Sequence, residues 1–277
     1  RAPRLTFATL LDGWIDPRPL AFVRIAVGAA GVLAGLELLG IAGRVLAPGI
    51  VALPLLPGLP RITAAMLPAV VGLWLALALL VALGALLRPA ALALAALAGH
   101  TILSEQQFYS NHVYLLVVLL LILAWSPADR AWALRPRRGP APRLVPGFAA
   151  ALLQLQISDV YLFSALSKLN PVYLSGAVLA AEPGVVALVE RLPIDPALTL
   201  RAGAAGAILA ELAIVACLWT PRLRPLAVLL GLGLHGAILT TMGAEPAGGI
   251  GLLMFATCML APYALFFARR ARPPAAV

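Results

Sequence analysis

Charged residues are scarce in this 277-residue chain, since Asp, Glu, Lys and Arg make up only 11% of it while hydrophobic residues make up 62%. Soluble domains of ordinary composition carry about 25% charged residues, so the composition argues against a water-soluble globular protein. Aromatic residues contribute only 6%. The apolar mass is therefore mainly Ala, Leu, Val and Gly, a composition that suits close packing of helices in lipid.

Cysteine and lysine are also rare. The two cysteines, Cys217 and Cys258, lie in apolar stretches without CxxC spacing, so neither a disulfide framework nor a thiolate metal site is expected. We also find no His/Glu set with ligand spacing and predict no metal site. Lys168 is the one lysine among 20 basic residues.

The formal net charge of +9 would suggest a nucleic-acid partner in a soluble domain. Here the basic residues lie between apolar segments, where membrane topology explains them better, so we expect no nucleic acid and a lipid bilayer as the main partner.

Apolar windows of transmembrane length, separated by Pro, Gly or Arg, recur along the chain. They lie near 20–41, 66–87, 90–104, 112–126, 146–168, 202–220, 224–242 and 249–268. The pattern predicts an all-α integral membrane protein, a polytopic bundle of about eight transmembrane helices that forms a single domain over 1–277. Strands are not expected, because alternating patterns are absent. The third and fourth windows are the short ones, and the apolar, Pro-rich 42–65 linker indicates a loop or half-helix at the interface.

The basic residues predict the orientation of this bundle. With the amino terminus inside, fourteen of them fall in cytoplasmic segments and five outside, which favours an inner (plasma) membrane protein with both termini cytoplasmic. Several polar side chains collect at the opposite, outward end, and we therefore expect a site on the outer face. They are His100, Ser104, Glu105, Gln107, Asn111, His112 and Lys168.

The fifth window carries a polar stripe. Gln154, Ser158, Tyr161, Ala165 and Lys168 recur at intervals of 4, 3, 4 and 3 residues, and therefore lie on one helix face. A charge at mid-bilayer costs roughly 2.5–3.5 kcal/mol on insertion scales, so this face is expected to line a cavity or the bundle interior.

Two interpretations of Lys168 stay open. In one, its ammonium snorkels to the outer headgroups from the helix end. In the other, it is a catalytic base. Arg snorkels equally well and occupies every other basic position of this chain, whereas only a lysine can lose its proton and become a base.

The segment SEQQFYSNHVYLL, residues 104–116, opens the fourth window. Ser110 or Asn111 is expected to cap the helix, and His112 is a candidate general base whose ring Asn111 and Tyr114 are placed to hold. His100, Ser104 and Gln107 share one helical face by spacing. His235 lies deeper and is either a helix-packing hydrogen bonder or a cavity residue.

Three further charges lie inside apolar windows: Arg24, Glu37 and Glu211. Arg24 and Glu37 are separated by about 20 Å along one helix and cannot pair with each other. We therefore expect each of the three to find a partner on another helix.

Three motifs, DPRPLAFVRIAVG, SNHVYLL and QLQISDVYLFSALSKLN, together resemble the horizontally transferred transmembrane domain (HTTM) family. Its members are bacterial relatives of vitamin K-dependent gamma-glutamyl carboxylase. By this resemblance Lys168 matches the lysine regarded as the base that deprotonates vitamin K hydroquinone, and His112 matches the histidine of the family's Asn-His segment.

The resemblance also implies the cofactors, which are a reduced quinone of the vitamin K hydroquinone or menaquinol kind, with O₂ and CO₂. The candidate cofactor-binding residues are Asn111, Tyr114, Gln154, Ser158, Tyr161 and His100. The chain departs from the carboxylase in having Ser167-Lys168 in place of a Lys-Lys pair and Asn170 in place of an Asp. We also expect no soluble propeptide-binding domain, which would leave substrate recognition to a partner or to the short outer loops.

These observations favour a carboxylase-like membrane enzyme, a quinol-dependent lyase. It would couple quinol and O₂ chemistry to proton abstraction from a secreted peptide or small substrate at the outer face. One alternative is a non-enzymatic membrane partner, or immunity-like protein, of a secreted peptide. Another is a small-molecule permease, against which the absence of an internal repeat argues.

Overall fold

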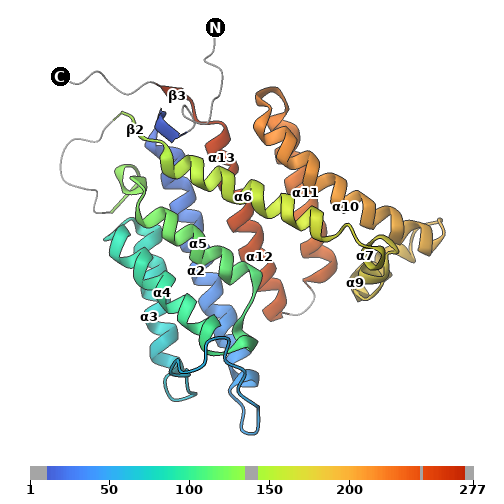
Figure 1. Cartoon of the computed structure of the whole chain (residues 1–277), viewed down its shortest axis with the longest axis horizontal. Coiled ribbons are helices and arrows are strands. Elements are labelled where there is room, and N and C mark those ends of the chain that lie inside the picture. The colour runs from blue at the N-terminus through green and yellow to red at the C-terminus, as the bar shows by residue number, and fades with distance from the viewer. Residues whose placement is uncertain (1–10, 135–142, 244–245, 272–277) are drawn as a thin grey trace. The chain divides into compact units, whose positions relative to one another are not determined.

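The computed structural model of the protein describes residues 11–134, 143–243 and 246–271, and in these ranges it consists almost entirely of helices (Figure 1). The helices are α2 (Pro17–Val45), α3 (Leu67–Leu83), α4 (Leu87–Ser104), α5 (Asn111–Ala124), α6 (Phe148–Ser167), α7 (Pro171–Leu174), α8 (Ala177–Ala180), α9 (Pro183–Val189), α10 (Pro196–Trp219), α11 (Arg224–Met242), α12 (Pro246–Leu260) and α13 (Tyr263–Phe266). Short 3₁₀ helices are η1 (Gln106–Phe108), η2 (Ala128–Arg130) and η3 (Pro221–Leu223).

Six helical segments of the described chain are long and apolar enough to cross a membrane. They are Pro17–Val45, Leu87–Ser104, Phe148–Ser167, Pro196–Trp219, Pro221–Met242 and Gly248–Phe266. Two further apolar helices, α3 and α5, have 17 and 14 residues. Each of the eight predicted windows therefore contains a helix, and the prediction of an all-α polytopic membrane protein is confirmed. The second window, rather than the third, gives the other short helix besides α5.

The expectation of no strands was wrong in one detail. Three two-residue strands, β1 (Trp14–Ile15), β2 (Val145–Pro146) and β3 (Arg270–Ala271), form an antiparallel sheet in the order β2-β1-β3. Strands this short are invisible to an alternation pattern, which needs at least four residues.

The chain packs as two compact units. The first comprises residues 1–153 and 253–277, and the second comprises residues 154–252. Six basic residues that contribute to the predicted topology lie outside the described residues. They are Arg1, Arg4, Arg135, Arg137, Arg138 and Arg272.

In the first unit, α2 packs side by side with α3, and α4 with α5 (Figure 1). Asp16 caps the start of α2 by accepting a hydrogen bond from the Arg18 amide. Glycine lets the two helix backbones approach closely, because a Cβ on Gly28 would collide with the backbone of Ala82. Trp74 of α3 donates its indole N–H to the Gly31 carbonyl at 2.8 Å.

Arg24 is fully buried inside this unit. Its guanidinium donates to the carbonyls of Ala128, Ala131 and Trp132 at 2.9, 3.2 and 2.6 Å. A buried charge needs such partners, and the backbone that follows α5 supplies them. Arg24 thus finds its partners in the 3₁₀ helix η2 and in the residues that follow it. The expectation of a partner on another helix therefore holds only for Ala128.

The 42–65 linker forms turns after α2 ends rather than a half-helix. It is held at the end of α4 by Glu105, whose carboxylate accepts from Arg61 at 2.5 Å and from the Leu53 amide at 3.3 Å. The Leu56 amide also donates to the Leu103 carbonyl at 2.9 Å. The Pro-rich segment is therefore fixed by specific hydrogen bonds.

In the second unit, α10 and α11 pack along each other, and α7, α8 and α9 pack against α10 (Figure 1). Asp195 caps α10 by accepting from the Leu198 amide at 2.8 Å. α9 approaches the end of α11 so closely that a Cβ on Gly184 would collide with the Thr241 carbonyl. The outer surfaces carry exposed leucines such as Leu209 and Leu229, as expected of helices that face lipid.

Candidate functional site

Lys168 lies one residue beyond the end of α6, in the second unit, in contact with two polar side chains. Its Nζ donates to Ser164 Oγ at 2.5 Å and to Glu211 Oε1 of α10 at 2.6 Å. Ser164 in turn donates its hydroxyl to the same Glu211 oxygen at 2.8 Å. The three groups form a closed hydrogen-bonded triangle, which we call the Lys168 cluster (Ser164, Lys168 and Glu211).

Helical spacing builds the Lys168 cluster. Ser164 and Lys168 are four residues apart and therefore face the same way, and Glu211 comes from the middle of α10. The Glu211 side chain is only 8% exposed and that of Lys168 is 22% exposed. The second carboxylate oxygen of Glu211, Oε2, is buried and has no hydrogen-bond partner among the described residues.

Tyr173 of α7 borders the Lys168 cluster, with the centre of its ring 5.9 Å from Nζ. Burial raises the pKa of the Tyr173 hydroxyl, and the negative charge of Glu211 raises it further. An aromatic face at this distance stabilises an ammonium group.

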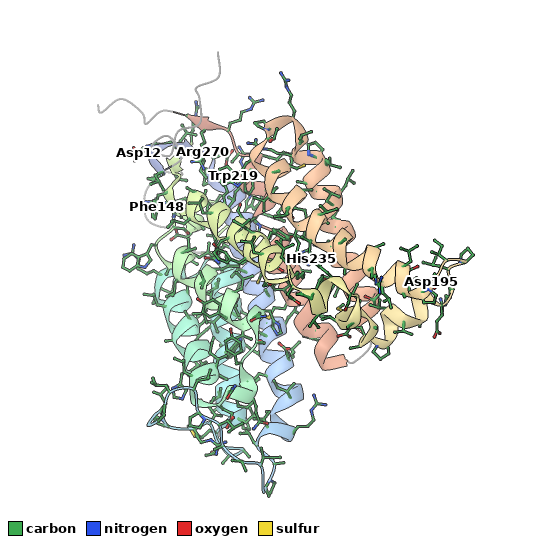
Figure 2. All side chains as sticks on the ribbon, turned by 45° about the vertical axis from the view of Figure 1, so that its right-hand side comes forward. Asp12, Phe148, Asp195, Trp219, His235 and Arg270 are labelled. Carbon is green, nitrogen blue, oxygen red and sulfur yellow. The ribbon has the colours of Figure 1, made fainter. Side chains whose placement is uncertain are left out.

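The predicted stripe on α6 is buried where it precedes Lys168. Gln154, Ser158 and Tyr161 are all less than 10% exposed. Ser158 accepts from the Trp219 indole at 2.9 Å, and the Tyr161 hydroxyl is 2.9 Å from His235 Nε2. His235, labelled with Trp219 in Figure 2, is thus a buried helix-packing hydrogen bonder, one of the two roles expected for it.

His112 lies in the second position of α5, in the first unit. Its Nε2 is 2.9 and 2.8 Å from the two carboxylate oxygens of Glu37, on α2. The sequence predicts that Asn111 and Tyr114 hold this ring. Instead, Asn111 accepts from the Tyr109 hydroxyl at 3.4 Å, and the Tyr114 side chain is exposed.

A cavity of about 150 Å³ adjoins Glu37 in the first unit. Glu37 lines it together with apolar and aromatic side chains, among them Trp74, Phe108 and Tyr109. An engineered apolar cavity of similar volume holds benzene. This cavity is therefore large enough for one aromatic ring.

The remaining predicted residues are arranged differently from the expectation. Ser110 does cap α5, by accepting from the Val113 amide at 3.4 Å. His100 is half-buried and makes no hydrogen bond to another described residue. Gln107 lies in η1 rather than in α4, so the helical face predicted for His100, Ser104 and Gln107 ends at Ser104.

The sequence did not predict which acidic residue joins which basic one. Glu37 and Glu211 were recognised as intramembrane charges, but their partners, His112 and Lys168, are 75 and 43 residues away in the chain. Ser164 was missed, although its i, i+4 spacing to Lys168 was a usable signal. The structure groups Lys168 with Ser164 and Glu211 in the second unit, and His112 with Glu37 in the first.

Comparison with known proteins identifies the same family that the three sequence motifs resemble. The family model described as HTTM domain matches residues 14–269, which is nearly the whole chain. No curated protein and no solved structure matches it. The match spans all three motifs on which the resemblance rests, and the chain belongs to the HTTM domain family.

Proposed function

We propose that this protein is a carboxylase-like membrane enzyme in which Lys168 is the catalytic base. The HTTM domain is associated with vitamin K-dependent carboxylase-like proteins. In the proposed reaction, the oxidation of a reduced quinone by O₂ is coupled to removal of a proton from a secreted peptide or small substrate at the outer membrane face. Carbon dioxide is the proposed co-substrate where carboxylation follows.

The observation that carries this proposal is the environment of Lys168. A lysine that only snorkels extends into the headgroup region and needs no acidic partner. Lys168 instead bonds a carboxylate that is itself inside an apolar helix. Polar and charged groups within membrane spans are expensive and are by default functional candidates.

The hydrogen bonds of Lys168 leave one position of the amine available to a substrate in either protonation state. A neutral amine has two N–H donors and one lone pair, and Ser164 Oγ with Glu211 Oε1 are two acceptors. In the neutral form both donors are used and the lone pair is left to take a proton. In the ammonium form a third N–H remains, for which a substrate oxygen or the Tyr173 ring provides the partner.

The residues fit a hydroxyl-bearing cosubstrate. When bound, a reduced quinone supplies the acidic hydroxyl and the reducing electrons. Glu211 Oε2 is a buried carboxylate oxygen without a donor among the described residues, and such an atom is stabilised by a hydroxyl group. Lys168 takes the proton, and Ser164 and Glu211 hold the amine in place.

The proposal is tested by replacing Lys168 with arginine, which keeps a positive charge but cannot act as a base. Quinol-dependent O₂ consumption and incorporation of labelled CO₂ are measured with the full chain in proteoliposomes. We expect Lys168→Arg to fold and to lose turnover, whereas Phe163→Leu, an exposed change on the same helix, keeps it. Turnover that survives Lys168→Arg overturns the base role. Indifference to Lys168→Ala, with a co-purifying peptide, would favour a non-enzymatic partner instead.

A further inference from the structure

Both carboxylate oxygens of Glu37 contact a single atom of the His112 ring. Both carboxylate oxygens approach the same ring nitrogen, Nε2, at 2.9 and 2.8 Å. A lone pair on Nε2 would face two negatively charged acceptors, which is repulsive, whereas an N–H there donates to both. The geometry therefore places a hydrogen on Nε2.

The other ring nitrogen is in a different position. Nδ1 of His112 has no hydrogen-bond partner among the described residues. The His112 side chain is 17% exposed and that of Glu37 is 12% exposed, so the pair is held inside the unit while the ring keeps some access to its surroundings. Of the residues that the structure describes, Glu37 is the charged group that contacts the ring.

Two protonation states are compatible with a hydrogen on Nε2. In the first, His112 is an imidazolium that forms an ion pair with Glu37 and simply joins α2 to α5. In the second, the ring is neutral and Nδ1 carries a lone pair. The tautomer of a neutral histidine is set by the hydrogen bond that its other nitrogen makes, so in this second state Glu37 decides which atom is basic.

We propose that Glu37 is a positioning residue that holds a neutral His112 in the Nε2–H tautomer, so that Nδ1 is the atom that accepts a hydrogen bond or a proton from a ligand. The inference deepens the proposed function, on which its catalytic meaning rests. The ligand group that Nδ1 recognises is an O–H or N–H donor, and a carboxylate or other bare acceptor is disfavoured there.

The chain is suited to a direct test, because it has only three histidines. The full chain is labelled with ¹⁵N-histidine and its ring nitrogens are observed by NMR in lipid nanodiscs at neutral pH. His112 is assigned by comparison with His112→Gln, and His100 and His235 serve as internal references. We expect a protonated Nε2 and an unprotonated Nδ1 in His112. Protonation of both nitrogens would overturn the proposal.

Glu37→Gln gives the matched variant. A glutamine amide can donate to Nε2 and so permits the opposite tautomer, whereas Glu37→Asp keeps the carboxylate. We expect Glu37→Gln to convert His112 partly or wholly to the Nδ1–H form and Glu37→Asp to keep the Nε2–H form. An unchanged tautomer in Glu37→Gln contradicts the role of Glu37. If Glu37→Gln does not fold, the spectra of the unaltered chain and of Glu37→Asp decide.

A kinetic measurement separates positioning from packing. Loss of one general acid–base group reduces rates by about 10²–10⁴-fold, so Glu37→Gln should lower kcat by up to that factor with little change in KM. Glu37→Asp should restore part of it. The NMR result does not depend on turnover, so failure of the proposed function at Lys168 leaves the tautomer test intact, and failure of the tautomer test leaves the base role of Lys168 standing.

Discussion

Removing the charge of Lys168 and removing the charge of Glu211 should destabilise the protein by different amounts. Breaking a buried ion pair by deleting one partner costs roughly 3–5 kcal/mol, because the other charge stays behind without compensation. Lys168→Met leaves the Glu211 carboxylate, which is only 8% exposed, whereas Glu211→Gln leaves Lys168, which is 22% exposed and near a helix end. The lysine can turn its ammonium toward water, but the carboxylate cannot.

We therefore expect Lys168→Met to lower the free energy of unfolding by about 3–5 kcal/mol and Glu211→Gln to lower it by about 1–3 kcal/mol. The double variant should be more stable than the sum of the single effects predicts, with a coupling energy of roughly 1–3 kcal/mol. The assay is denaturant unfolding in detergent micelles, followed by tryptophan fluorescence.

The control is Phe163→Leu, on the same helix but exposed; a substitution at such a site stays within about 0.5 kcal/mol. The reasoning is refuted if Lys168→Met is no more damaging than the control, or if the two single effects simply add. If Glu211→Gln lowers the free energy of unfolding more than Lys168→Met does, the burial of the remaining charge does not determine which variant is less stable.

Two further predictions concern the first unit. Burial alone would raise the pKa of Glu105, but hydrogen bonds from the Gln107 and Leu53 amides and from Arg61, with the charge of Arg61, hold it below its usual value. Its contribution to stability is thus fully present above the unfolded-state pKa of about 4.3 and is lost as the pH falls through the lower folded-state pKa. The melting temperature should therefore fall as the pH is lowered below about 4. It should fall less steeply in the Arg61→Met variant. In α2, Gly28→Ala places a Cβ 2.5–2.6 Å from Ala82 and should cost about 1–3 kcal/mol in thermal unfolding. Gly43→Ala, where a Cβ meets nothing within 4 Å, should stabilise by up to about 1 kcal/mol; equal effects at the two glycines would contradict the close approach.

The helices were predictable because lipid imposes length and apolarity on each span. The window near 20–41 lies within α2, and the window near 202–220 ends one residue beyond α10. Asp16 and Asp195 cap the first turns of these helices and fix starts that hydropathy alone does not define. The strands were not predictable, since a pair such as Trp14–Ile15 is selected by its tertiary neighbours rather than by its own pattern.

The candidate site was predictable only as separate residues. The stripe from Gln154 to Lys168 depends on the period of one helix, so spacing alone defines it. The pairing of Lys168 with Glu211, and of His112 with Glu37, depends on which helices pack together. A single sequence carries no signal for that choice, because any acidic residue in any span satisfies the same electrostatic need.

The small sheet has a consequence for the order in which the protein is assembled. Its central strand, β1, pairs with β2 from mid-chain and with β3 near the carboxyl end, and the second unit is an insertion between these partners. At a synthesis rate of about 5–20 residues per second, roughly 100 inserted residues occupy the ribosome for about 5–20 s. During that interval the first unit has been synthesised except for its last segment. One edge of β1 then has no strand to pair with, because β3 has not yet been made. The first unit can therefore fold completely only after the second unit has been synthesised. The segment that contains β3 sets the time at which this folding step can occur.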